Sequence, residues 1–246
     1  MERKRATAIL LAGGSGTRMG GSVRKQYMEL GGKPVLRYAL EALERSPVIS
    51  EIVLVVPEGE QDYCRREIVE PAEEACRAAQ SGGKVRAIIP GGAERCFSVL
   101  NGLRAIQWPC EVCYIHDGAR PFLDGETLER LARAVADGGT AVAGMPAKDT
   151  VKLADADGIV ESTPNREAVW IVQTPQVFER ALITEAYERM AEQYDALRAA
   201  GVNITDDAMV VERLMNRSVR LVPASYRNIK ITTPEDLLIA EAFLRG

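Results

Sequence analysis

Short apolar runs alternate with amphipathic helical patterns along most of this chain. Near-continuous apolar runs such as Thr7–Ala12 and Glu51–Val56 are typical of strands that are buried on both faces. Between these two runs, Pro34–Arg45 has apolar residues at helical spacing and a proline suited to a first helical turn. Strands that alternate with helices in this way predict an α/β Rossmann-like fold, a mainly parallel twisted sheet with helices on both faces.

The same alternation extends over the rest of the sequence. The chain has 246 residues, 46% of them hydrophobic, which is enough to build one large α/β domain. We see no internal repeat and no linker, so we expect a single domain over residues 1–246. Further strands are predicted at 84–89, 112–115, 140–145 and 218–223, and helices near 61–79, 94–106, 125–136, 178–200, after Thr205 and at 234–244.

The alternation breaks after Met145. Residues 148–174 contain short β-leaning pieces around a turn at Asp155–Gly158, and no long helix fits there. We therefore predict a β-hairpin arm at about residues 147–175 that projects from the sheet. A projecting hairpin buries little of its own surface, so we expect a partner surface to cover it.

A glycine-rich stretch, AGGSGTRMGGSVRKQY from Ala12 to Tyr27, follows the first predicted strand. The dinucleotide fingerprint requires a glycine where Met19 stands, and the P-loop requires a lysine where Ser22 stands. A tight turn without a ligand is a further alternative, although five glycines cost conformational entropy that such a turn does not need. We favour a loop whose backbone N–H groups point at phosphate oxygens, with Arg18 and Lys25 adding positive charge.

Charge and cysteine content narrow the classes of partner. A formal net charge of −4 gives no global basic surface, so we expect no nucleic-acid partner. Cys110 and Cys113 have the spacing of half a zinc site, but no second pair completes it, and we expect reduced thiols. No apolar run is long enough to span a membrane, and the N-terminal residues lack a signal-peptide pattern, so we expect a cytoplasmic protein without a membrane partner.

Several short motifs follow one another in a fixed order. They are the glycine loop with KQY at 25–27, GGAERCFSV at 91–99, HDGARP at 116–121, KDTVK at 148–152, Asn165-Arg166 with Trp170, TPQ at 174–176, ITDDA at 204–208 and NIKIT at 228–232. This order resembles that of sugar-phosphate nucleotidyltransferases and, within them, the polyol-phosphate cytidylyltransferases. The chain is similar to the family of 2-C-methyl-D-erythritol 4-phosphate cytidylyltransferases over nearly its whole length. Ribitol-5-phosphate cytidylyltransferases share several of these motifs and remain the alternative, but Trp170 and Thr205–Asp207 favour the first family.

The resemblance implies a reaction of CTP with 2-C-methyl-D-erythritol 4-phosphate. The products would be 4-diphosphocytidyl-2-C-methyl-D-erythritol and pyrophosphate, in the non-mevalonate synthesis of isoprenoid precursors. A phosphate monoester is already an anionic nucleophile at neutral pH, so catalysis would depend on charge neutralisation and alignment rather than on a strong base. This chemistry suits a chain with one histidine and no evident catalytic triad.

The resemblance also implies roles for individual residues. Asp117, at the end of a predicted strand, would hold Mg²⁺ or another divalent cation. The catalytic residues would be Arg18, Lys25, Arg166 and Lys230. The nucleotide would be bound by Ala12, Gly13, Gly14, Ser15, Gly16, Thr17, Gly91, Gly92, Arg95, Ser98, Asp117 and Gly118. The polyol phosphate would be bound by Arg120, Thr150, Arg166, Thr174, Thr205 and Lys230.

The family also implies a homodimer in which each arm reaches into the neighbouring subunit. Two residues depart from the family pattern: Arg24 stands where proline is common, and Ala93 where an acidic residue is common.

A nucleotide sensor without catalysis is a competing hypothesis, but it predicts the loss of Arg18, Lys25 or Asp117, and all three are present. A dinucleotide-dependent oxidoreductase is a third hypothesis, which the missing third glycine argues against.

Overall fold

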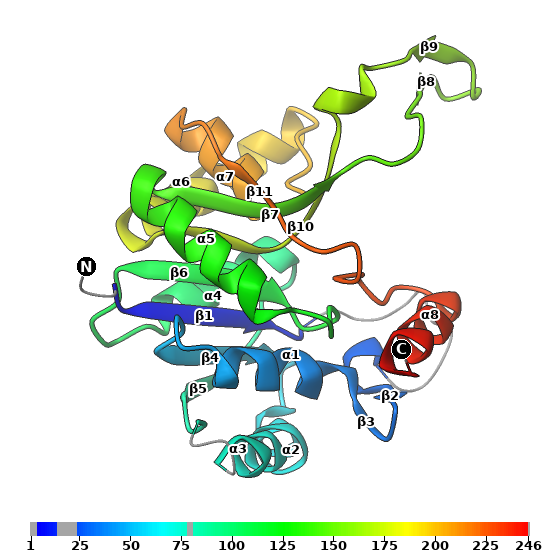
Figure 1. Ribbon diagram of the computed structural model, residues 1–246. Coiled ribbons are helices and arrows are strands. Elements are labelled where there is room, and N and C mark those ends of the chain that lie inside the picture. Colours follow the sequence, from blue (N-terminus) through cyan, green and yellow to red (C-terminus); the bar gives the residue numbers. More distant parts are fainter. Residues whose placement is uncertain (1–3, 14–23, 78–80, 246) are drawn as a thin grey trace.

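A mixed, mostly parallel sheet forms the centre of the molecule (Figure 1). The computed structural model describes residues 4–13, 24–77 and 81–245, and for Lys25 the backbone alone. In this part of the chain the sheet has seven strands, in the order β11-β7-β10-β6-β1-β4-β5. All neighbours pair in parallel except β10, which is antiparallel to both β6 and β7. The predicted α/β fold is confirmed. The strands are β1 (Ala6–Leu11), β4 (Glu51–Val56), β5 (Val85–Pro90), β6 (Val112–Asp117), β7 (Thr140–Pro146), β10 (Trp170–Glu179) and β11 (Leu221–Pro223).

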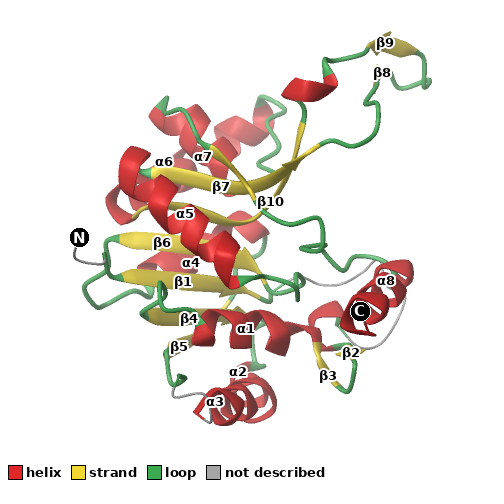
Figure 2. Cartoon of the chain, viewed as in Figure 1, coloured by secondary structure: helices red, strands yellow, loops and turns green. Residues whose placement is uncertain are grey.

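Alternate residues of the central strands face two separate apolar cores. Leu10 and Leu54 belong to one core, whereas Ile9 and Val53 belong to the other. Because side chains alternate across a strand, a strand with a core on each face is expected to be mainly apolar, as β1 is apart from Thr7 and β4 apart from Glu51. Figure 2 shows the helices on both faces. The first core lies under α1 (Val35–Arg45), α3 (Glu70–Arg77) and α5 (Gly125–Gly138), and the second under α4 (Arg95–Arg104), α6 (Arg180–Ala199) and α7 (Asp207–Met215).

The C-terminal helix, α8 (Pro234–Arg245), packs away from both faces, against the short strand β2 (Glu29–Leu30), which pairs with β3 (Lys33–Pro34). This places the segment before α8 beside the C-terminal ends of the central strands (Figure 1). The predicted helix over 61–79 is divided in the structure. It consists of α2 (Gln61–Cys64), a π-helical turn (Arg65–Val69) and α3.

The predicted arm leaves the sheet after β7 and extends away from the rest of the chain (Figure 1). It carries a small antiparallel pair, β8 (Leu153–Ala154) and β9 (Val160–Ser162), and a 3-10 turn at Arg166–Ala168. Large apolar side chains are exposed along it, among them Leu153, Ile159 and Val160.

The arm is shorter than the sequence predicts. Trp170–Val172 pair with Gly144–Pro146 of β7, so the projecting part ends at Val169. The strand β10 then continues through Pro175 to Glu179. Its register against β7 shifts between Val172 and Gln176, as at a β-bulge, and this shift accommodates the irregular segment within one strand. The following helix therefore begins at Arg180 rather than near Phe178. Among the helices that the structure describes, none combines the length and the apolar character that a membrane crossing requires.

Candidate active site

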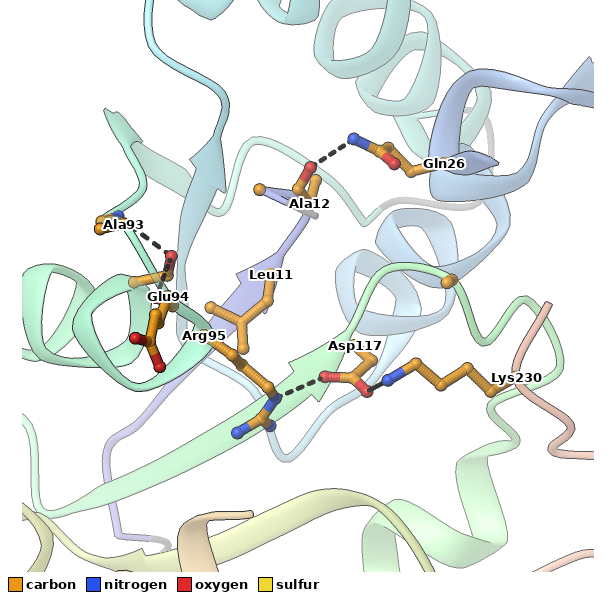
Figure 3. Close-up of a pocket in the computed structure, with 12 residues that line it drawn as sticks. Leu11, Ala12, Gln26, Ala93, Glu94, Arg95, Asp117 and Lys230 are labelled. Carbon is orange, nitrogen blue, oxygen red and sulfur yellow. Dashed lines mark hydrogen bonds and ion pairs between the residues drawn. The ribbon is translucent and has the colours of Figure 1, made fainter. Parts of the chain in front are cut away.

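A cavity of about 450 Å³ lies at the C-terminal ends of β1 and β6 (Figure 3). Open α/β sheets bind ligands beyond the carboxyl ends of their strands, so this is the expected place for a site. The walls come from the end of β1, the start of α4, the end of β6 and the segment before α8. The lining residues are Leu11, Ala12, Gly13, Gln26, Gly92, Ala93, Glu94, Arg95, Ser98, Asp117, Ala119 and Lys230.

Asp117 lies between two cations in this cavity. The Nε atom of Arg95 donates to Asp117 Oδ1 at 3.2 Å, and the Nζ atom of Lys230 donates to Oδ2 at 2.7 Å (Figure 3). Burial by itself would raise the pKa of Asp117, but the nearby charges of Arg95 and Lys230 outweigh it and hold the pKa far below its usual range. The carboxylate is therefore ionised throughout the neutral pH range.

The terminal nitrogens of Arg95 point to a second carboxylate. Nη1 and Nη2 donate to Oδ1 and Oδ2 of Asp207, each at 2.8 Å. Asp207 is fully buried in the first turn of α7 and also accepts a hydrogen bond from the Tyr187 hydroxyl. Burial would lower the pKa of Arg95, but Asp207 and Asp117 raise it well above its usual value. One guanidinium thus connects a carboxylate of the cavity with a carboxylate of the core.

A chain of polar contacts fixes the backbone at the end of β6. The backbone N–H of Asp117 donates to Thr174 Oγ1 at 3.0 Å, and this hydroxyl lies 2.9 Å from His116 Nδ1. His116 Nε2 lies 3.3 Å from the carbonyl oxygen of Arg120, an arrangement that places the imidazole proton on Nε2. Burial lowers the pKa of His116 to about 4, so the ring is neutral at physiological pH. In this chain Thr174 therefore holds the backbone of Asp117.

The start of α4 forms one wall of the cavity. Ser98 Oγ accepts a hydrogen bond from the backbone N–H of Gly92 at 3.0 Å. A Cβ atom at Gly92 would lie 2.4 Å from the Cβ of Phe97, so only glycine fits this turn. Gly91 does not line the cavity, but a Cβ atom there would lie 2.9 Å from Ser98 Oγ.

Gly118 has a packing role. A Cβ atom there would lie 2.5 Å from Leu36 Cδ1 and 3.0 Å from the carbonyl oxygen of Leu11, and Gly118 does not line the cavity. Arg120 also lies outside the lining. Its Nη1 donates to the carbonyl oxygen of Asn228 at 2.8 Å, which anchors the segment that carries Lys230.

The residues after the glycine loop return to the cavity. Gln26 Nε2 donates to the carbonyl oxygen of Ala12 at 2.5 Å, which fixes the end of β1. Arg24, the departure from the family pattern, donates from Nε to Glu60 Oε1 at 3.0 Å. Lys25 begins a 3-10 turn (Lys25–Tyr27) next to Gln26. The expected contacts of Arg18, Gly14, Ser15, Gly16 and Thr17 lie outside the described residues.

Three residues assigned to the polyol phosphate lie away from the cavity lining. Thr150 and Arg166 are exposed on the arm, where Arg166 Nη1 donates to the carbonyl oxygen of Lys148 at 3.3 Å. Thr205 is exposed before α7, and its hydroxyl donates to Met209 Sδ at 3.7 Å. The residues that the cavity does bring together are Ala12, Gly13, Gly92, Arg95, Ser98, Asp117 and Lys230.

Sequence reasoning did not single out Asp207 or Tyr187. The signal lies in the Thr205–Asp207 segment, in which the family pattern assigns a site role to Thr205 alone. In the structure Asp206 caps α7 by accepting from the Met209 N–H at 2.9 Å, and Asp207 forms the ion pair with Arg95. A pair of adjacent acidic residues at a helix start is usually explained by capping alone, which hides the second role.

Comparisons with known proteins agree with the geometry. The sequence profile of the 2-C-methyl-D-erythritol 4-phosphate cytidylyltransferase family matches residues 6–246. Proteins of that name from Geobacter metallireducens and Geotalea uraniireducens are 46% and 48% identical over 241 and 246 residues. These alignments cover 97% and 98% of this chain, and 97% of each relative.

Solved structures show the same fold. The 4-diphosphocytidyl-2C-methyl-D-erythritol synthase of Anaerococcus prevotii is 33% identical with a TM-score of 0.82, and covers 100% of this chain and 98% of that one. The 2-C-methyl-D-erythritol 4-phosphate cytidylyltransferase of Thermus thermophilus is 28% identical with a TM-score of 0.71. The match covers 98% of this chain and 100% of that one. The chain therefore belongs to the 2-C-methyl-D-erythritol 4-phosphate cytidylyltransferase family.

Proposed function

We propose that this chain transfers the cytidylyl group of CTP to 2-C-methyl-D-erythritol 4-phosphate and releases pyrophosphate. The family and its near full-length relatives support this reaction. The observation that carries it is the position of Asp117, ionised at the end of β6 between Arg95 and Lys230. Ribitol 5-phosphate is the less favoured acceptor, because the relatives at 46% and 48% identity are named for methylerythritol phosphate.

The reaction needs two anions to meet. An oxygen of the polyol phosphate attacks the α-phosphorus of CTP, a P–O bond forms there, and the bond to the β-phosphate oxygen breaks as pyrophosphate leaves. Lys230 lines the cavity, so its ammonium would bring positive charge to the two reacting phosphate groups. We assign the same function on the triphosphate to Arg18 and Lys25, from the match of the glycine loop to the family pattern.

The residues present fit a divalent cation that arrives with CTP. The described residues contain no group of three His, Cys, Asp or Glu side chains that would bind a metal by itself. Mg²⁺ is commonly held by one or two carboxylates together with substrate phosphates and water, and Asp117 is an ionised carboxylate in the cavity. When bound, such an ion would neutralise triphosphate charge, and Asp117 would hold it.

We further propose a homodimer whose arms complete the neighbouring sites. The arm exposes Leu153, Ile159 and Val160, and apolar surface of this kind marks contacts between proteins. Thr150 and Arg166 lie on the arm and not at the cavity of their own chain, which is consistent with a role in the partner's site. We propose a cytoplasmic location, which the five free cysteines support, because reducing compartments keep thiols unpaired.

Pyrophosphate release with purified full-length protein tests the proposed reaction. We expect release with CTP plus 2-C-methyl-D-erythritol 4-phosphate, and much slower release when ribitol 5-phosphate replaces it. UTP and ATP in place of CTP measure the preference for cytosine. Equal or faster turnover of ribitol 5-phosphate would reassign the acceptor, and no release with either polyol would refute the proposed function.

A further inference from the structure

Arg95 divides its hydrogen bonds unequally between two carboxylates. Its terminal nitrogens form a two-pronged contact with Asp207, with both distances at 2.8 Å, while Asp117 receives only the Nε–H at 3.2 Å. Two-pronged contacts between arginine and a carboxylate are the stronger and more directional kind. The orientation of the guanidinium is therefore set by Asp207, which is not part of the cavity lining.

Asp207 is itself held from several sides. It is fully buried, and Tyr187, also fully buried, donates its hydroxyl proton to Asp207 Oδ1. Asp207 also stands at the first residue of α7, where the helix dipole favours negative charge. A buried carboxylate is costly without such partners, so Tyr187, α7 and Arg95 together hold Asp207 in place.

In this arrangement Arg95 hydrogen-bonds to only one oxygen of Asp117, Oδ1. Oδ2 accepts only from the Lys230 ammonium among the hydrogen bonds of the described residues, at 2.7 Å. If the terminal nitrogens of Arg95 turned from Asp207 to Asp117, they would cover both oxygens with a fixed pair of donors. Lys230 is a single flexible donor and can exchange with a ligand, whereas a two-pronged arginine contact resists exchange.

We propose that Asp207 and Tyr187 are positioning residues that act through Arg95 to keep Asp117 available to the nucleotide. This inference rests on the proposed cytidylyl transfer and deepens it. Asp207 binds the terminal nitrogens of Arg95, and Tyr187 holds Asp207. Loss of Asp207 frees Arg95 to occupy Asp117, so the triphosphate and its divalent ion lose access to that carboxylate. The polyol phosphate keeps its own contacts.

The test measures KM for each substrate and the Kd of CTP with Mg²⁺ by calorimetry. For Asp207→Asn we expect KM and Kd for CTP to rise about tenfold, which corresponds to about 1.4 kcal/mol, because Arg95 then competes with the nucleotide for Asp117. In the same variant, KM for the polyol phosphate should change by less than about twofold. Tyr187→Phe keeps the shape of the side chain and removes one hydrogen bond, so a rise of about threefold in the CTP parameters is expected.

A double-variant comparison separates positioning from general destabilisation. If Asp207 acts through Arg95, then Asp207→Asn adds little to KM for CTP once Arg95→Lys has already removed the two-pronged contact. Glu51→Gln is the matched control. It removes the charge of another buried carboxylate, which pairs with Nη2 of the exposed Arg5 at 2.6 Å, at the N-terminal end of β4. It should lower the melting temperature while leaving both KM values unchanged.

The outcomes distinguish the inference from the function on which it rests. A wild-type protein without pyrophosphate release refutes the function. An active wild type whose Asp207→Asn variant keeps its KM for CTP, or changes both KM values equally, refutes the inference. If Asp207→Asn does not fold, an unchanged Kd for CTP in Tyr187→Phe refutes the inference in its place.

Discussion

Lys230 Nζ lies 2.7 Å from Asp117 Oδ2, although 113 positions separate the two residues in the sequence. The contact joins the end of β6 to the segment before α8. Arg120 supports it, because its guanidinium holds the carbonyl oxygen of Asn228, two residues before Lys230. The C-terminal segment therefore completes a site that begins at the first strand.

Removal of the Lys230 charge is expected to slow the reaction strongly. Lys230→Gln should lower kcat by about 10²–10³, the usual cost of losing one well-placed donor at a developing charge. The fold should remain, because Arg95 still neutralises Asp117. Pyrophosphate release measures the rate. Lys33→Gln, which breaks the ion pair with Glu41 at 2.8 Å outside the cavity lining, is the control. A fall of less than about tenfold for Lys230→Gln would contradict the assignment.

His116 should remain neutral down to unusually low pH. The chain has one histidine, so a proton NMR titration gives a single imidazole curve. Burial lowers the pKa of His116 from 6.5 to about 4, and the folded protein should titrate near the lower value. Between these two values the unfolded state binds more protons than the folded state. Stability therefore decreases as the pH falls through that window. A midpoint near 6.5 in the folded protein would show that the ring is accessible.

A charge on the arm should dissociate the proposed dimer. Ile159 is 65% exposed on the arm, and Leu238 is 68% exposed on α8. We expect Ile159→Asp to shift the mass in light scattering from dimer to monomer, because a buried unpaired carboxylate opposes association. Leu238→Asp places the same charge on an equally exposed apolar residue and should leave the mass unchanged. Dissociation by Leu238→Asp alone would move the interface to α8, and a monomeric wild type would exclude the dimer.

Cys110 should be the most reactive thiol of the chain. Its Sγ lies 3.9 Å from that of Cys113, and the hydrogen bond from Cys113 lowers the pKa of Cys110 to about 6. The other four cysteines are buried, and Cys110 is only partly buried. Iodoacetamide at pH 7 should therefore modify about one thiol per chain, at Cys110, because the thiolate is the reactive form. Peptide mass spectrometry identifies the site. Cys110→Ser should abolish this fast phase, and fast labelling that persists in the variant would contradict the prediction.

The parallel strands could be predicted from the sequence, but β10 could not. The runs at β1 and β4 are apolar except for Thr7 and Glu51, and this pattern has few alternatives to a strand that is covered on both faces. In β10, Pro175 and the polar side chains of Gln173, Thr174 and Gln176 interrupt the apolar pattern. These polar side chains are nevertheless buried, because they bond to segments distant in the sequence. For example, Gln173 Oε1 accepts from Asn228 Nδ2 at 3.0 Å.

The sequence alone determined the positions of the parallel strands, the family and the placement of Asp117 at a strand end. Each of these depends on local order along the chain, which apolar spacing and motif order record directly. Only the tertiary structure decided that Lys230 reaches Asp117 and that Arg95 turns its terminal nitrogens to Asp207. A charged side chain selects its partner by distance and orientation in space, and those are set by the packing of β6, α4 and α7 around one cavity.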